Sequence, residues 1–143
     1  MDLKEMYREI VNEHNLHPAH KHGLDNPTLT LRGVNPSCGD DITLQLVVEN
    51  DVITDGAYVG QGCAISQASA DMMLDLVIGK TKDEALKVAD IFMRMIKNEA
   101  TDEEIESLDE AAALQNISHM PARVKCAQLG WRTMDEIIKG GEN

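Results

Sequence analysis

The chain has 143 residues, with 13 basic and 25 acidic side chains that give a formal net charge of −12 at neutral pH. This length suits one ordinary domain, so we expect a single domain over residues 1–143. The negative charge argues against a nucleic-acid partner, because the phosphates would be repelled. No apolar run approaches the ~18 residues of a membrane span and the first residues lack a signal-peptide layout, so we expect a cytoplasmic protein without a membrane partner.

The first half of the sequence predicts a helix followed by a small sheet. Apolar residues recur at helical spacing over residues 2–15, which indicates an amphipathic helix. A loop with two prolines over 17–27 leads into an extended segment at 28–32. Alternating apolar and polar residues at 42–48 predict a strand with one buried face, and a turn precedes a second strand at 52–59. These two strands are expected to form an antiparallel hairpin.

The second half of the sequence is predicted to be helical. One helix is expected from about Cys63 to the residue before Gly79, and a capping box of Thr81 and Glu84 predicts the start of the next. Pro121 can begin a last helix at its first turn. Three short strands followed by several helices predict an α+β fold with the sheet covered on one face.

Residues 99–110 contain seven acidic side chains and no basic one, beginning with a possible helix cap at Thr101. Two interpretations are open for this segment. It could be a solvated helix or mobile insert, or it could offer an acidic docking surface to a partner with a basic patch.

The three cysteines favour metal binding or redox chemistry, because three thiols cannot all pair within one chain and a cytosol keeps thiols reduced. The alternative is that each is a small buried hydrophobe, but each is bordered by residues typical of loops or helix starts. Cys38 and Asp40 straddle a glycine and can point the same way, and Cys63 stands where a helix start favours its thiolate. With Cys126 near the start of the last helix, they supply the four ligands of a tetrahedral thiophilic metal.

The composition of this ligand set suggests a site that exchanges ligands. Three thiolates and a carboxylate around Zn²⁺ leave negative charge that needs nearby cations, and Arg123 and Lys125 flank Cys126. An exposed basic pair is the alternative interpretation of these two residues. A carboxylate is the odd member of a thiolate set, and structural zinc sites more often show CxxC spacing, which is absent here.

The histidines receive no metal role from the sequence. His14, His17, His20 and His22 cluster within nine residues, an arrangement that can bind metal but that prolines and polar neighbours make more typical of a surface loop. His119 lies seven positions before Cys126, too far to assume a shared site. A cysteine hydrolase would need an activating histidine beside a cysteine, which one sequence does not reveal.

Three motifs, in order along the chain, resemble a known family: Asn-Pro-Ser-Cys-Gly-Asp at 35–40, Gly-Gln-Gly-Cys at 60–63 with Ser-Gln-Ala-Ser at 66–69, and Arg-Val-Lys-Cys-Ala at 123–127. They resemble the iron–sulfur cluster assembly proteins of the IscU/NifU N-terminal type, over nearly the whole chain to about Ile138. The resemblance implies an α+β fold, with a three-stranded antiparallel sheet and helices on one face. Within the family the sequence is most similar to the SufU branch.

Features near Cys126 and in the acidic segment indicate which branch of the family the sequence resembles. Lys125 stands where housekeeping scaffolds place a histidine, which removes a potential cluster ligand. Residues 120–125 are not the Leu-Pro-Pro-Val-Lys sequence that scaffolds offer to an Hsp70-type chaperone. The acidic segment at about 99–115 looks like the insert of the SufU branch.

The resemblance also implies function. Cys38, Asp40, Cys63 and Cys126 would be the zinc ligands, Cys38 the sulfur acceptor and Arg123 a partner contact. The protein would take persulfide sulfur from a PLP-dependent cysteine desulfurase of the SufS type and serve downstream iron–sulfur assembly proteins, as a sulfurtransferase-like carrier rather than a stand-alone enzyme. One alternative is a scaffold that assembles a transient [2Fe–2S] cluster on the same ligands. A purely structural zinc module is the other.

Overall fold

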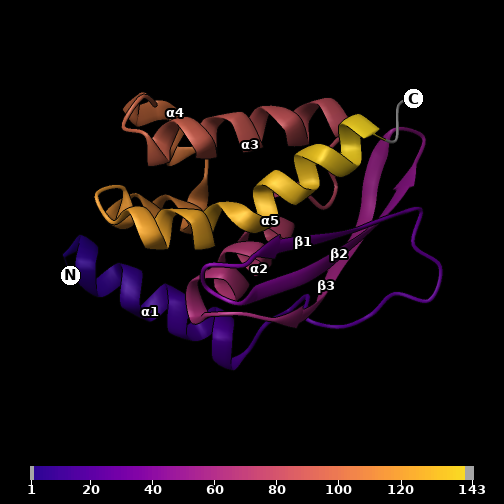
Figure 1. The fold of residues 1–143 in the computed structure, drawn as a ribbon. Helices are drawn as coiled ribbons and strands as arrows, with labels where there is room; N and C mark the ends of the chain where they lie inside the picture. Colours follow the sequence, from indigo (N-terminus) through magenta and orange to yellow (C-terminus); the bar gives the residue numbers. More distant parts are fainter. Residues whose placement is uncertain (1, 141–143) are drawn as a thin grey trace.

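The computed structural model describes residues 2–140 and consists of a small sheet covered by helices (Figure 1). The elements in chain order are α1 Leu3–Leu16, β1 Leu29–Asn35, β2 Asp40–Glu49, β3 Val52–Gln61, α2 Ala64–Val77, α3 Lys82–Ile96, α4 Asp102–Glu106, the 3₁₀ helix η1 Asp109–Ile117 and α5 Pro121–Gly140. No helix in this described part is long and apolar enough to cross a membrane.

The sheet is an antiparallel meander in the order β1-β2-β3. Strand β2 buries alternate residues over most of its length, as the period-two pattern predicts. Both hairpins extend further than the sequence pattern indicated, because ladder pairing continues to Asn35 opposite Asp40 and to Gln61 opposite Asp41. These paired ends bring the β1–β2 turn and the residues before α2 to one edge of the sheet.

The helices pack on one face of the sheet, which confirms the predicted α+β fold. Helix α5 contacts β1 and β2, α2 contacts β3, and the two helices contact each other, while α3 packs on α5 and α2 (Figure 1). Gly130 permits the α2–α5 approach, since a Cβ there would lie 3.2 Å from the Cβ of Ala70. The rings of Phe92 and Trp131 stack with centroids 4.2 Å apart and join α3 to α5.

The acidic segment is partly built into the core. Thr101 caps α4, as expected, and forms a capping box with Glu104. Leu108, Leu114 and Ile117 are fully buried, although the acidic residues around them are mostly exposed. Helix α4 has no buried residue, as the interpretation of residues 99–110 as a solvated helix predicts, whereas the apolar side chains of η1, which follows it, pack against α1, α2 and α3.

Candidate metal centre

Cys38 lies in the tight turn that joins β1 to β2. Its backbone N–H donates to the carbonyl of Asn35 over 3.2 Å, and its side chain is exposed. Gly39 follows with φ of 72°, a left-handed conformation that favours glycine. The turn thus presents one thiol to solvent directly before Asp40, the first residue of β2.

Asp40 is completely buried, and its carboxylate joins three segments. Oδ1 accepts hydrogen bonds from the backbone N–H of Cys63 at 2.8 Å and from Ser66 Oγ at 3.1 Å. Oδ2 accepts a longer bond of 3.3 Å from Asn35 Nδ2. One carboxylate oxygen is therefore fixed by α2 and the other remains available to a cation.

Cys63 is the N-cap of α2, as the turn before it predicted. Its Sγ accepts a hydrogen bond from the backbone N–H of Ser66 over 3.4 Å, so the positive end of the helix faces this sulfur. The preceding Gly62 is required by space, because a Cβ would lie 2.5 Å from Ser66 Oγ and 2.8 Å from Asp40 Oδ1. The glycine permits α2 to begin directly against the aspartate.

Cys126 is buried in the second turn of α5. Its thiol donates to the carbonyl of Ala122 at 3.5 Å, and Asn35 Nδ2 lies 3.9 Å from its sulfur. Burial raises the pKa of the Cys126 thiol well above its ordinary value, and the neighbouring Cys38, Cys63 and Asp40 raise it further. Without a cation this sulfur is a protonated thiol surrounded by groups that disfavour its charge.

The structure brings the four predicted ligand residues to one place. The ligand atoms of Cys38, Asp40 and Cys126 all lie within 4.8 Å of one another. Cys63 lies outside this group of three, but it is among the residues that raise the pKa of the Cys126 thiol. Cys38, Cys63, Cys126 and Arg123 line one pocket of about 380 Å³, the cysteine pocket. Soft sulfur donors with one carboxylate fit Zn²⁺, and Arg123 supplies a cation beside them.

The two flanking cations have different surroundings. Arg123 lines the cysteine pocket, whereas Lys125 lines a separate hollow together with Arg32 and Arg132. Only Arg123 is therefore placed to offset negative charge at the thiols. The sequence named both residues and could not separate them, because they differ only in which side of α5 they occupy.

Tyr7 is a member of the site that the sequence did not indicate. It comes from α1, is buried, and its hydroxyl lies close enough to Arg123 for that cation to act on it. Burial raises the pKa of Tyr7, the Arg123 contact opposes this, and Cys63 and Cys126 raise the pKa further. In the sequence, Tyr7 is one apolar position of the amphipathic pattern at residues 2–15. That pattern does not reveal that the residue lies next to Arg123 of the last helix.

The histidines occupy two different environments. His17 and His22 are exposed, as expected for residues of a surface loop, and His119 is exposed too. His14 is buried on α1, so the surface interpretation is wrong for it, and Nδ1 lies 2.6 Å from Asp71 Oδ2. The pattern missed this because the aspartate that holds the ring is 57 positions away.

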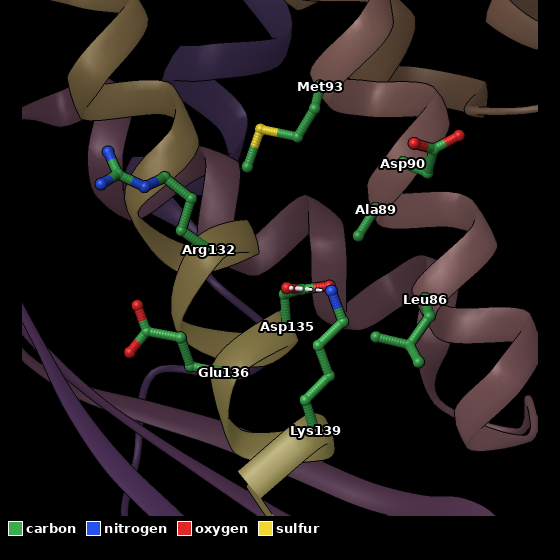
Figure 2. A pocket seen from close by; sticks show the side chains of 8 residues that line it. All are labelled: Leu86, Ala89, Asp90, Met93, Arg132, Asp135, Glu136 and Lys139. Carbon is green, nitrogen blue, oxygen red and sulfur yellow. Dashed lines mark ion pairs between the residues drawn. The ribbon is translucent and has the colours of Figure 1, made fainter.

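A further hollow, of about 410 Å³, lies between α3 and α5 (Figure 2). Leu86 and Met93 line its α3 side, and an ion pair of 2.9 Å joins Lys139 to Asp135 on α5. Neither cysteine nor histidine lines it. The thiol chemistry is therefore confined to the pocket at the sheet edge.

Comparison with known proteins identifies the family. A model of the NifU-like N terminal domain matches residues 6–127. The chain belongs to this family. Its members include both kinds of protein that the sequence motifs suggested, so membership alone does not separate them.

Two relatives resemble the chain over most of their length. The iron-sulfur cluster assembly scaffold protein IscU of Streptococcus pyogenes serotype M1 is 40% identical over 99% of this chain and 87% of its own. The zinc-dependent sulfurtransferase SufU of Bacillus subtilis is 36% identical over 94% of this chain and 90% of its own. The names of these relatives divide between scaffold and transferase.

A solved structure supports the fold directly. A protein of Fervidobacterium islandicum AW-1, described as a scaffold for iron–sulfur cluster assembly in the SUF system, is 33% identical and superposes with a TM-score of 0.87. The match covers 94% of this chain and 97% of that one. The three-stranded sheet with its helices is thus the architecture of this relative too.

Proposed function

We propose that this protein is a zinc-dependent sulfur acceptor in iron–sulfur cluster assembly, which receives sulfur from a PLP-dependent cysteine desulfurase of the SufS type. The observation that carries the proposal is the convergence of an exposed thiol, a buried thiol and a buried carboxylate within 4.8 Å of one another. The relative named a zinc-dependent sulfurtransferase, 36% identical over nearly the whole chain, supports the same assignment.

Cys38, Asp40, Cys63 and Cys126 would hold the zinc. When bound, zinc would keep the thiols deprotonated and restrain their nucleophilicity. The chain holds one ligand in a fixed position, since the Asp40 carboxylate accepts hydrogen bonds from the backbone N–H of Cys63 and from Ser66 Oγ. Arg123, at the rim of the pocket, offsets the excess negative charge and is placed to contact a docked partner.

Cys38 is the acceptor because it is the exposed thiol of the set, whereas Cys126 is buried. Its thiolate attacks the outer sulfur of the desulfurase persulfide, forming a new S–S bond on Cys38. The old S–S bond breaks and the desulfurase cysteine leaves as a thiolate, while the proton of the persulfide stays on the transferred sulfur. Electrons balance without an added oxidant, as in any thiol–disulfide exchange. The loaded carrier then delivers its sulfur to downstream assembly proteins.

Substituting the acceptor tests this proposal. Cys38→Ala should keep the fold yet gain no sulfur when zinc-loaded protein is mixed with desulfurase and cysteine, because the nucleophile is gone. Mass spectrometry of the 38-containing peptide measures the mass of one added sulfur atom, and desulfurase turnover is followed in parallel. The matched control is Ser37→Ala in the same turn, which retains the thiol and should accept sulfur normally. Sulfur transfer at the normal rate to the Cys38→Ala protein would overturn the assignment.

A scaffold for a [2Fe–2S] cluster is the second candidate, favoured by the name of the 40% identical streptococcal relative. The same experiment separates the two functions. A scaffold would take up iron and sulfide but would show neither sulfur on Cys38 nor faster desulfurase turnover. The acceptor function is supported further by Lys125, which offers no imidazole beside Cys126 and does not line the cysteine pocket.

A further inference from the structure

We propose that the protein has a second cation site, away from the cysteines, where His14, Asp75 and Glu110 bind a divalent first-row transition ion through nitrogen and oxygen. The ligand atoms of these three residues all lie within 4.8 Å of one another. They come from α1, α2 and η1, three elements that pack against one another. The site is independent of the sulfur chemistry proposed above.

The central observation is an unpartnered nitrogen on a buried ring. His14 is only 6% exposed, and among residues 2–140 its Nε2 has no hydrogen-bond partner. Burying a polar atom without a partner costs free energy, so this nitrogen requires an explanation. Nε2 lies 3.5 Å from Glu110 Oε2, within ion-pair range but without forming a hydrogen bond.

The other ring nitrogen is held as metal-binding histidines usually are. Nδ1 lies 2.6 Å from Asp71 Oδ2, and the Asp71 carboxylate also accepts the backbone N–H groups of Ala19 and His20. A ligating histidine typically donates its second nitrogen to a carboxylate, which fixes the tautomer and strengthens the ligand. With the proton on Nδ1, Nε2 carries the lone pair, and Glu110 Oε2 lies 3.5 Å from it.

The spacing fits a cation between the ligands. Two ligands bound at about 2.0–2.1 Å to a tetrahedral ion lie about 3.4 Å apart, close to the 3.5 Å between His14 Nε2 and Glu110 Oε2. In a neutral ring the Nε2 lone pair would face the Glu110 carboxylate, and that contact is repulsive unless a cation lies between the two atoms. One imidazole with two carboxylates suits zinc and its neighbours in the first transition row.

Access and support are also present. The Asp75 and Glu110 side chains are 46% and 56% exposed, so an ion can enter from solvent and reach the buried ring nitrogen. His20 Nε2 lies 2.8 Å from Asp75 Oδ1 and orients that carboxylate. A bound ion would fix η1, part of the acidic segment, to the first helix and α2.

Counting bound metal in matched variants tests the site. Metal-free protein is titrated with Co²⁺, and bound equivalents are measured by dialysis and elemental analysis while thiolate-to-cobalt absorption reports the cysteine site. The wild type should bind a second equivalent that adds no thiolate absorption. Glu110→Gln should weaken this equivalent at least about tenfold, since it removes a ligand. Glu106→Gln, an exposed carboxylate in α4 with the same charge change, should retain both equivalents.

Further measurements keep the test decisive. Asp75→Asn should lose the same equivalent as Glu110→Gln, and Cys38→Ala should weaken only the equivalent with thiolate absorption, which separates this site from the proposed function. Nitrogen NMR in the presence of Zn²⁺ should show His14 Nε2 unprotonated and shifted by metal. A single equivalent in all proteins, or an imidazolium ring protonated on both nitrogens with Zn²⁺ present, would overturn the site and leave a simple ion pair with Asp71 and Glu110.

Discussion

At the scale of single residues, Asp40 organises the cysteine pocket. Its buried carboxylate accepts hydrogen bonds from Asn35 on β1 and from Cys63 and Ser66 at the start of α2. A buried carboxylate is costly unless donors surround it, so the three donors and the aspartate depend on one another. The geometry of the pocket is therefore sensitive to small changes next to Asp40.

Gly62→Ala should disturb this arrangement. The added Cβ would lie 2.5 Å from Ser66 Oγ and 2.8 Å from Asp40 Oδ1, so the two side chains must separate and one hydrogen bond is lost. We expect a loss of about 1–3 kcal/mol in the free energy of unfolding and weaker zinc binding. Chemical denaturation and a competitive zinc titration measure these effects.

Gly23→Ala is the matched control for that prediction. A Cβ there would make only an ordinary contact, 3.9 Å from Gln45 Oε1. It should leave zinc affinity unchanged. Equal zinc affinity in the Gly62→Ala and Gly23→Ala proteins would show that the fixed position of Asp40 does not matter to the metal.

Much of the cysteine site could be predicted from sequence, because its signals are local. The glycine between Cys38 and Asp40 and the helix start after Cys63 are visible in short motifs. Tyr7 and Asp71 could not be predicted, because their roles come from partners far along the chain: Tyr7 contacts Arg123, and Asp71 holds His14. Helical spacing indicates which side chains face inward but not which group they meet.

At the scale of elements, the acidic segment is joined to α3 by an ion pair. Arg94 on α3 donates to both carboxylate oxygens of Glu104 on α4, with one of these bonds at 2.8 Å. The hydrogen bonds from Arg94, followed by the backbone N–H of Thr101, lower the pKa of Glu104 from 4.5 to about 2. Glu104 therefore belongs both to the capping box of α4 and to the ion pair with Arg94.

Glu104→Gln should loosen α4 and change the acid stability of the protein. Because the folded-state pKa is depressed, the stabilisation is present above the unfolded-state pKa and is lost as pH falls from about 4.5 towards 2. Across this pH interval the melting temperature of the wild type should fall more steeply than that of the variant. At neutral pH the variant should have the lower melting temperature. Thermal melts at several pH values measure both effects.

Glu103→Gln provides the comparison for that prediction. Glu103 is exposed, carries the same charge and is the neighbour of Glu104 in α4. Its substitution should leave the fall in melting temperature at acid pH the same as in the wild type. If both variants showed the same curve, the Arg94 pair would contribute nothing specific to the attachment of α4.

Element boundaries show where sequence patterns stop being informative. The caps at Thr81 and Thr101 were predicted, since the signal for a helix cap lies within four consecutive residues. The burial of Leu108 and Ile117 was not, because the acidic residues between them mask the apolar pattern. Their burial is decided by the helices that η1 meets.

At the scale of the whole molecule, the cysteine pocket lies at the margin of a much larger core. The buried cluster extends through the sheet, α1, α2, α3, η1 and α5 and reaches the pocket at Cys126, whereas Cys38 is exposed. A metal that binds only the folded state adds to stability by mass action. It need not be the reason that the chain folds.

Removal of zinc should therefore lower the melting temperature without unfolding the protein. The large apolar core remains buried when the pocket is empty, so helical circular dichroism at room temperature should persist with a strong chelator present. Thermal melts with zinc, with chelator and with zinc restored measure the shift and its reversibility. Cooperative unfolding on chelation at room temperature would instead support a purely structural zinc module.

The contact between Asn35 and Cys126 has a consequence for biosynthesis. These two side chains approach to 3.9 Å, yet they are 91 positions apart in sequence. A growing polypeptide on the ribosome has Cys38, Asp40 and Cys63 long before it has Cys126 and Arg123. The pocket is complete only after α5 has emerged and packed against β1, so metal delivery belongs to the finished protein, and a chain stalled before α5 offers only an incomplete set of ligands.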